Sequence, residues 1–405
     1  MIKNTLYIFA GRASNALFLF LLTLVVSRQL GPSLFGVFSF ITTVVISANS
    51  FSNLGLDIWM VREITKVPEK AKQYLSAILG LKMAASLIII AFIFLIFQMT
   101  DLPETTLHLL WILSISILFN TISQTLWHYG DCFKEFVYHS FLWAVSNIVK
   151  SVLGIALVLF YGELEFLVIG IVFAEAFALL LSIYVIRRRF GRFAPQFQFS
   201  VWVDFLSRSA PIAMGTLFSV LYFRLDIVML QLMTDDKMVG FYSAAYKLYE
   251  VAVVFPQSLM IVLFPSLVEE FHADRSAFKI RFKKAFAVYL AVGSSIALVF
   301  FVFSNEIINL TYGNDFLFSV EVLDILACAT PILFLNFLLS NILIVSGWEK
   351  VNTWSLVGAT ALNIVLNLAW IPEYGAMGAA KATLACEIAL IAVLGFQSRK
   401  AFKNP

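Results

Sequence analysis

The sequence predicts an all-α polytopic membrane protein with twelve transmembrane helices in two six-helix lobes. Of the 405 residues, 61% are hydrophobic and only 13% are charged, whereas about 25% charged residues is usual for soluble domains. The mean hydropathy is +0.91. Apolar runs of about 20 residues, long enough to span a bilayer as a helix, recur along the whole chain. A water-soluble globular domain is therefore excluded.

The first lobe is expected over residues 1–190. Lys3 and Arg12 precede an apolar run from Leu17 to Val26, as in a signal peptide, but no small-residue cleavage site follows this run. We therefore interpret it as part of a retained first span, at 5–27. Five further spans are expected at 35–60, 74–98, 106–129, 137–160 and 164–186.

A cytoplasmic linker is expected over residues 191–204, where polar residues interrupt the apolar runs. The second lobe, 205–405, then holds six spans and a short cytoplasmic tail. The spans are expected at 205–233, 238–267, 285–310, 320–346, 351–371 and 376–397. All these runs are long and continuous rather than alternating, which argues against the strands of a membrane barrel.

The positive charges predict the orientation. With both termini placed in the cytoplasm, nineteen of the 28 Lys and Arg residues lie in cytoplasmic segments, and only Arg28 and Lys237 lie in external loops. This bias satisfies the positive-inside rule and favours an even number of helices. The net charge of +3 therefore reflects topology, and we expect no nucleic-acid partner.

The two halves resemble each other in the order of their polar residues. Asn120 aligns with Asn336 in the equivalent span, and Glu175 near the end of the first half aligns with Glu387 near the end of the second. Repeated bundles around a site at the membrane midplane are a recurrent plan among transporters. The pattern predicts two parallel repeats that are related by an axis along the membrane normal.

Several kinds of chemistry find no support in the sequence. The four histidines share no metal-ligand spacing with cysteines or carboxylates, so no metal site is expected. The three cysteines are scattered, and no Gly-rich phosphate loop precedes a Lys-Ser/Thr pair. No cofactor is expected, and the external loops are too short for a catalytic domain. Energy must come from an ion gradient, the membrane potential or the substrate gradient.

Charged residues inside the spans carry the functional argument, because a charge near the bilayer centre costs about 2.5–3.5 kcal/mol and usually lines a substrate or ion path. Four cations are the candidates for binding an anionic substrate. Asn15 follows Arg12 and Asn147 precedes Lys150 by three residues, giving both helices a polar face. The four are Arg12, Lys150, Arg224 and Lys247.

Some of these charges could have a structural role instead of binding a substrate. Lys247 and Glu250 are i,i+3 neighbours and could neutralise each other as a structural pair. Arg224 and Asp226 point to different faces, so Arg224 needs a partner on another helix or a substrate phosphate. Three further cations, Lys82, Arg208 and Lys381, could reach the interface through their long stems. Four acids are candidate proton or sodium groups: Asp226, Glu250, Glu175 and Glu387.

Five stretches resemble the polysaccharide-repeat flippases, the O-antigen or Wzx-type family of the multidrug/oligosaccharidyl-lipid/polysaccharide exporter superfamily. The superfamily also includes the multidrug and toxin extrusion (MATE) transporters and the peptidoglycan-precursor flippase. The resemblance covers essentially the whole chain. The stretches are Ser27–Phe40, Ser52–Glu63, Phe223–Leu230, Val239–Glu250 and Ile371–Glu387.

The resemblance implies a pseudo-symmetric, MATE-like pair of bundles with a cationic cavity that opens to alternate sides of a bacterial cytoplasmic (inner) membrane. The cargo would be an undecaprenyl-diphosphate-linked oligosaccharide, moved to the periplasmic leaflet for O-antigen or other surface polysaccharide and lipopolysaccharide. The four candidate cations would bind its diphosphate and acidic sugars. Lys381 stands where the family usually has an apolar residue, and could contact a sugar.

The implied partners are the lipid-linked substrate, membrane lipids, H+ or Na+ as coupling ion and polysaccharide polymerase machinery. Two other functions stay open. A drug or cation antiporter of the same superfamily would favour acids over solitary arginines in its cavity. A membrane-embedded polymerase or ligase would be an enzyme, but such enzymes carry a substantial external loop, which this sequence lacks. We therefore expect a transporter and not an enzyme.

Overall fold

In the described part of the chain, helices are the only regular secondary structure. The computed structural model describes the backbone of residues 2–403 and the side chains of residues 18–210 and 212–402. This region contains thirteen α-helices and two short 3₁₀ helices, and no strand occurs within it. The prediction of an all-α polytopic membrane protein is confirmed. The chain forms two compact units, 1–220 and 221–405, each of which is described by itself.

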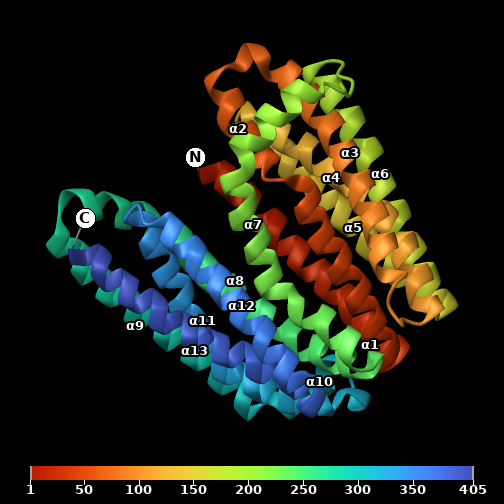
Figure 1. The fold of residues 1–405 in the computed structure, drawn as a ribbon, viewed down its shortest axis with the longest axis vertical. Coiled ribbons are helices and arrows are strands. Elements are labelled where there is room, and N and C mark those ends of the chain that lie inside the picture. The colour runs from red at the N-terminus through yellow and green to blue at the C-terminus, as the bar shows by residue number, and fades with distance from the viewer. Residues whose placement is uncertain (1, 404–405) are drawn as a thin grey trace. The chain divides into compact units, whose positions relative to one another are not determined.

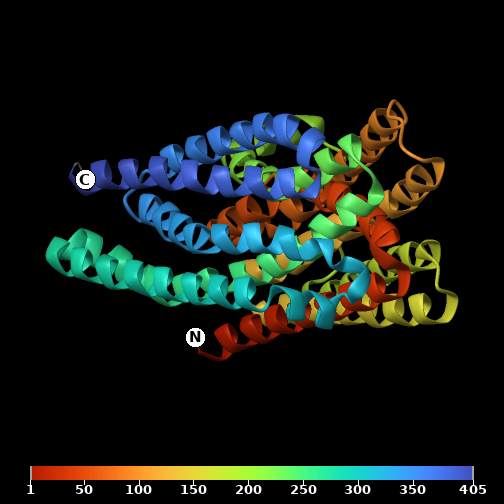
Figure 2. The same cartoon turned by 90° about the horizontal axis from the view of Figure 1, so that it is seen from below.

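The first unit contains six helices and the start of a seventh. In Figure 1 the helices of this unit lie lengthwise beside one another as a bundle, and Figure 2 shows the bundle from below. The helices are α1 (Ile2–Asn53), α2 (Leu56–Lys66), α3 (Ala71–Phe97), α4 (Glu104–Cys132), α5 (Phe136–Tyr161) and α6 (Leu164–Phe190), with the 3₁₀ turn η1 (Pro68–Lys70) before α3.

Helix α1 supplies the first two predicted spans. Its 52 residues are interrupted at Gly31, whose φ of 75° and ψ of 178° are not helical. Pro32 follows and can begin a helix, because the first helical residue needs no N–H donor. Figure 1 shows α1 running from the N-terminus to the far end of the unit and back toward α2. Eleven helical segments of the described chain are long and apolar enough to cross a membrane, counting Phe18–Lys66, which contains the break at Gly31, as one. This number is close to the twelve predicted spans.

The predicted second span, 35–60, was wrong at its end. The helix stops at Asn53, and α2 starts at Leu56 after two residues with left-handed backbone, Leu54 (φ 52°) and Gly55 (φ 68°). A Cβ atom on Gly55 would also lie 2.7 Å from the backbone nitrogen of Ala213. Glycine is therefore required here for both its conformation and its small size.

The second unit begins within α7 (Phe199–Met233), which starts in the first unit and ends in the second. The helices that follow are α8 (Asp236–Ala273), α9 (Arg275–Val302), α10 (Ser304–Thr311), α11 (Phe318–Val345), α12 (Glu349–Tyr374) and α13 (Ala376–Lys403), with the 3₁₀ turn η2 (Asn314–Phe316) before α11.

The predicted ninth span, 285–310, was misplaced because a helix start was missed. Asp274 caps α9: one carboxylate oxygen accepts hydrogen bonds from the backbone nitrogens of Ser276 (2.8 Å) and Ala277 (3.1 Å). These bonds favour the ionised carboxylate and lower the pKa of Asp274. The helix therefore starts ten residues earlier than predicted, ends at Val302, and is followed by the separate short α10.

The predicted linker is only partly non-helical. Residues 191–198 contain no helix, and α7 has already begun at Phe199. The segment docks on α3: the backbone nitrogen of Gln196 donates to Ser76 O (2.8 Å), and the indole of Trp202 donates to Ala77 O (3.1 Å). A Cβ atom on Gly80 would lie 2.1 Å from Gln196 O, so this close contact requires glycine.

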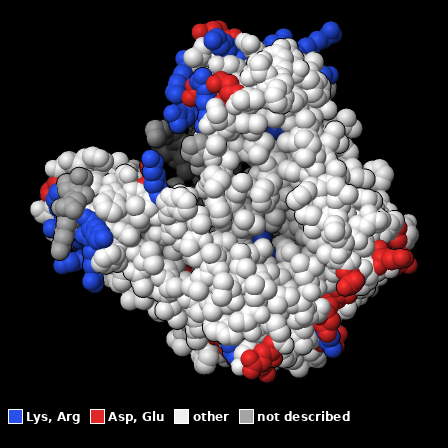
Figure 3. All heavy atoms as spheres, in the orientation of Figure 1, with Lys and Arg blue, Asp and Glu red and all other residues white. Residues whose placement is uncertain are grey.

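Charge and hydrophobicity are arranged as a bilayer requires. Large apolar side chains in the middle of the helices are exposed, among them Ile88 (69%) and Leu180 (67%). In Figure 3 cations gather at the end of the first unit that holds α2, and acids gather at its opposite end. An apolar belt between charged ends fits a lipid environment.

Candidate functional site

The first unit contains a polar network that begins at the candidate residues Lys150 and Glu175. Lys150 on α5 forms an ion pair with Glu175 on α6, and the two side chains are 19% and 4% exposed. Asn120 on α4 donates to the other Glu175 oxygen (3.0 Å). Lys150 is thus paired with an acid of its own unit, and its role in substrate binding stays a prediction.

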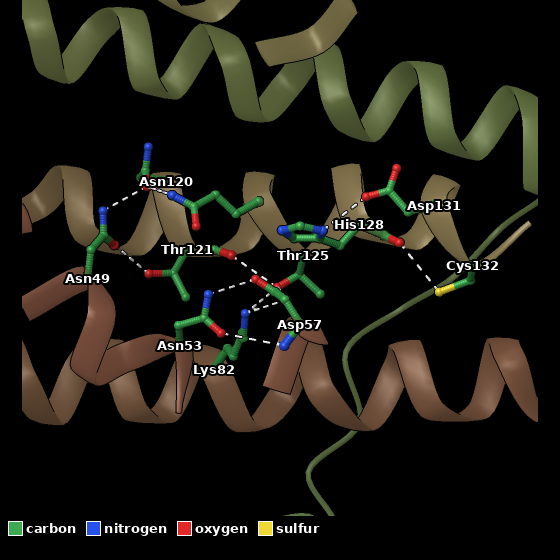
Figure 4. A network of polar contacts seen from close by, with 11 residues as sticks. Asn49, Asn53, Asp57, Lys82, Asn120, Thr121, Thr125, His128, Asp131 and Cys132 are labelled. Carbon is green, nitrogen blue, oxygen red and sulfur yellow. Dashed lines mark hydrogen bonds and ion pairs between the residues drawn. The ribbon is translucent and has the colours of Figure 1, made fainter. Parts of the chain in front are cut away.

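The network continues along α1 and α4 through amides and hydroxyls. Asn49 donates to Asn120 Oδ1 (2.7 Å), and Thr121 donates to Asn49 Oδ1 (2.7 Å). Gln124 also donates to Asn120 Oδ1 (2.6 Å). Figure 4 shows Asn49, Asn120 and Thr121 turned toward one another. Buried polar groups of this kind are stable only when they are paired.

A second ion pair, between α2 and α3, lies beside the next turn of α4 and was not predicted. Lys82 Nζ on α3 lies 2.6 Å from Asp57 Oδ1 on α2, and the side chains are 0% and 2% exposed. Thr125 bridges the pair, accepting from Lys82 (2.8 Å) and donating to Asp57 (3.0 Å), while Asn53 donates to Asp57 Oδ2 (2.8 Å). The expectation that Lys82 reaches the interface was wrong, because its ammonium is held inside the unit by an acid on another helix.

A histidine cluster lies beyond this pair, at the end of α4. Asp131 Oδ2 lies 3.0 Å from His128 Nδ1 and 2.7 Å from His139 Nδ1. This cluster was not predicted, because its histidines and its acid do not follow the spacing of a known metal-binding motif. The available signal was a His-x-x-Asp pair in the last turn of one helix with a histidine in the first turn of the next.

The candidate cations of the second unit form a cluster on α7 and α8, which we call the Arg224 cluster: Arg224, Lys247 and Glu250. Arg224 Nη2 lies 2.8 Å from Glu250 Oε1, and Lys247 Nζ lies 2.8 Å from Glu250 Oε2. The partner that Arg224 was expected to need on another helix is therefore Glu250. The three side chains remain 20–26% exposed, and two cations with one acid give a net charge of +1.

Asp226 forms no ion pair with Arg224 or Lys247 and occupies a separate buried site. It is 2% exposed and accepts hydrogen bonds from Tyr242 (2.6 Å), Asn367 (2.6 Å) and Thr383 (2.9 Å). No Lys or Arg among the described side chains pairs with it. The Asn367 Oδ1 atom is buried and has no protein donor, so several oxygens collect around a carboxylate that no cation neutralises.

Glu387 shows that the two units share a construction. It is 1% exposed and accepts from Asn336 Nδ2 (2.6 Å) and Tyr222 (3.0 Å). The Asn336–Glu387 bond joins the same residue types as the Asn120–Glu175 bond of the first unit, in each case from one helix to the second helix after it, and these are the pairs that the sequence repeat aligned. Lys150 has no counterpart here, so Glu387 is bound by neutral donors only.

The remaining candidate cations are placed as follows. Lys381 on α13 lies over the ring of Tyr374, with Nζ 3.8 Å from the ring centroid. Arg208 on α7 pairs with Asp204 one turn earlier (2.8 Å) and is exposed. The side chain of Arg12 lies outside the described residues. Among the candidate cations whose side chains are described, the Arg224 cluster and Lys381 therefore offer positive charge that no acid fully offsets.

Two family models match the sequence. One, described as polysaccharide biosynthesis protein, matches residues 1–271, which is more than half of the chain. The other, described as MatE, matches residues 211–369. An uncharacterized membrane protein of Methanocaldococcus jannaschii is 25% identical over 205 residues, which is 49% of this chain and 40% of that protein. This chain therefore matches less than half of that relative's length.

Solved structures share the fold along the whole chain. A lipid II flippase, MurJ, in an inward closed conformation has a TM-score of 0.79 at 18% identity, covering 100% of this chain and 89% of that one. An inward-facing multidrug resistance MATE family transporter of the MOP superfamily has a TM-score of 0.71 at 13% identity, covering 96% and 94%. At these identities the likeness shows the fold alone.

Proposed function

Because the chain belongs to the polysaccharide biosynthesis protein family, we propose that it is a flippase for an undecaprenyl-diphosphate-linked oligosaccharide. It would move this lipid from the cytoplasmic to the periplasmic leaflet of a bacterial inner membrane by alternating access. The family and the transporter fold support this reading, as does the resemblance of five sequence stretches to polysaccharide-repeat flippases. O-antigen or another surface polysaccharide would be the product of the pathway.

The observation that carries the proposal is the Arg224 cluster. It combines an Arg and a Lys with a single acid, remains partly exposed, and lies within helices that are otherwise apolar. A diphosphate carries more negative charge than one carboxylate, and a guanidinium can hold two phosphate oxygens at once. The substrate would displace Glu250 from Arg224 and become the stronger partner of both cations.

Exchange of partners also explains how the site can release its cargo. In the empty site Glu250 satisfies Arg224 and Lys247, so neither cation is left unpaired inside the membrane. When the diphosphate leaves, Glu250 returns. Since a lone buried charge would cost several kcal/mol, the acid keeps the empty transporter stable while it reorients. Glu250 thus has a role in substrate exchange rather than in ion coupling.

We assign coupling to Asp226. Its carboxylate is buried, unneutralised by any described cation, and surrounded by Asn367, Thr383 and Tyr242. Oxygen ligands of this kind suit Na+ or a proton. Transport would be measured in vesicles with a Na+ gradient or a pH gradient applied in turn. We expect Asp226→Asn to abolish gradient-driven transport and Arg224→Lys to lower only the affinity for the substrate. If Asp226→Asn transported as fast as wild type under each gradient, or if wild type transported equally well without any gradient, Asp226 would have no role in coupling.

Complementation in the source cell tests the function. Cells without the gene would receive wild type, Arg224→Ala or Arg208→Ala, a control because Arg208 is exposed and pairs locally. We expect wild type and Arg208→Ala to restore surface polysaccharide. Arg224→Ala should insert normally yet leave lipid-linked repeat units accumulating on the cytoplasmic side. Full polysaccharide with Arg224→Ala would contradict the assignment of this residue, and unchanged polysaccharide in the deletion strain would contradict the function.

A cation antiporter is the second candidate, and one observation favours it. The MatE match covers residues 211–369, the region that holds Asp226, and both Asp226 and Glu387 are buried without a described Lys or Arg partner. A cationic drug would bind acids of this kind. Altered sensitivity to cationic drugs in the deletion strain, with unchanged surface polysaccharide, would select this function.

A further inference from the structure

The end of α4 and the start of α5 bring three metal-ligating side chains together. We call them the histidine cluster: His128, Asp131 and His139. Their donor atoms all lie within 4.8 Å of one another, and both imidazoles direct Nδ1 at the same atom, Asp131 Oδ2, at 3.0 and 2.7 Å. The His128 and His139 rings lie edge to face, with centroids 4.7 Å apart. Figure 4 shows His128 and Asp131 side by side on α4.

The two carboxylate oxygens of Asp131 differ in their hydrogen-bond partners. Oδ2 of Asp131 receives both imidazoles, whereas Oδ1 is buried and has no partner in the described structure. The Asp131 side chain is only 10% exposed, and a buried carboxylate oxygen normally has a donor. The Asp131 carboxylate therefore keeps a free, buried acceptor oxygen next to the oxygen that both imidazoles contact, and a metal ion bound by this carboxylate would compensate its charge.

The space next to the cluster suits a metal ion with an open coordination position. A pocket of about 470 Å³ is lined by the three residues together with Gln124, Ser140 and aromatic rings. In a tetrahedral zinc site with bonds of about 2.0 Å, neighbouring ligand atoms lie about 3.3 Å apart. The two nitrogen–oxygen distances of 2.7 and 3.0 Å differ from this spacing by about 0.6 and 0.3 Å, and all the donor atoms lie within 4.8 Å of one another.

We propose that His128, Asp131 and His139 form a binding site for a transition-metal dication of the zinc class. Two imidazoles and one carboxylate supply three ligands, and water from the pocket supplies the fourth. Two nitrogen ligands favour Zn²⁺ over Mg²⁺ or Ca²⁺, which prefer oxygen. The ion ties α4 to α5 across a tight turn in which Lys134 has a left-handed backbone (φ 62°), and so fixes this corner of the first unit.

The test uses full-length protein in detergent, with any affinity tag removed and metals stripped by EDTA. Zn²⁺ is titrated by calorimetry, and thermal unfolding is recorded with Zn²⁺ and, as a control, with Mg²⁺. The variants are His128→Ala, His139→Ala and His139→Asn, which keeps a polar group that can hydrogen bond to Asp131. His108→Ala is the matched control, because this exposed histidine also lies beside an acid, Glu165.

Wild type and His108→Ala should bind one Zn²⁺ per chain at micromolar concentration or below and unfold at a higher temperature with Zn²⁺ but not with Mg²⁺. Each variant at His128 or His139 should bind at least tenfold more weakly and lose the temperature shift. If the alanine variants do not fold, the Zn²⁺ affinity of His139→Asn compared with that of wild type decides whether the site exists. No Zn²⁺ binding by wild type, or equal binding by His139→Asn and wild type, would overturn the proposal.

Discussion

Removal of one member of the Asp57–Lys82 pair should destabilise the protein more than any other single change to a charged residue in the first unit. Lys82→Met deletes the ammonium and leaves Asp57 with Asn53 and Thr125 as its remaining donors. Both charged side chains are almost fully buried, at 0% and 2% exposed. The carboxylate cannot recover the lost interaction from water.

The magnitude follows from the distance between the charges. Two unit charges 2.6 Å apart attract each other by about 6 kcal/mol at an effective dielectric constant of about 20. Burial of both groups offsets much of this attraction. Loss of one partner of a buried pair therefore destabilises by about 3–5 kcal/mol, because it leaves the other charge uncompensated. The double variant Asp57→Asn/Lys82→Met has no charge to compensate and should lie close to wild type.

Chemical unfolding in detergent micelles measures these differences. The two single variants, the double variant and Lys66→Met would be compared, since Lys66 forms an exposed i,i+3 pair with Glu63 and should show little change. The decisive quantity is the coupling energy of the double-mutant cycle. If Lys82→Met unfolds like wild type, or if the double variant is no more stable than the worse single variant, the pair is not the buried element described above.

Two further predictions concern packing and the Lys150 pair. Gly80→Ala should lower the unfolding midpoint in a thermal scan, because the new Cβ atom would lie 2.1 Å from Gln196 O. Gly358→Ala is the control and should leave the midpoint unchanged or raise it, because no atom lies within 4 Å of its Cβ position. Equal midpoints for the two variants would refute the close docking of residues 191–198 on α3. Lys150→Ala should destabilise by about 1–3 kcal/mol by leaving Glu175 with one donor, and Lys150→Ala/Glu175→Gln should recover stability and export if the pair is structural. Export that stays lost in the stable double variant would instead give Lys150 a role in transport.

Hydropathy predicted the helices well because each span is a property of one continuous segment. The break at Gly31 and the linker around residues 191–198 could both be placed from polar residues and Gly-Pro signals. Helix ends were less predictable. The end at Asn53 depends on how Gly55 meets Ala213, and the start of α9 depends on the Asp274 cap, which lies within a polar segment that gave no apolar signal.

The partners of the membrane charges could be predicted only in part. Lys247 and Glu250 are neighbours on one helix, so their pairing follows from spacing. Lys82 pairs with an acid on another helix, and hydropathy gives the depth of a residue but not the direction in which its side chain points. The repeat was informative here: the aligned residues Asn120 and Asn336 each donate to the aligned acid of their own unit.

Transport by purified protein is the most direct test of the flippase account. Wild type, Arg224→Ala and Arg208→Ala would be reconstituted into liposomes with an undecaprenyl-diphosphate oligosaccharide in the inner leaflet, and arrival of the sugar in the outer leaflet would be followed with a membrane-impermeant lectin. We predict that wild type and Arg208→Ala expose the sugar under an ion gradient and that Arg224→Ala does not. No exposure by well-folded wild type under either a Na+ or a proton gradient, or equal exposure by Arg224→Ala, would contradict the account.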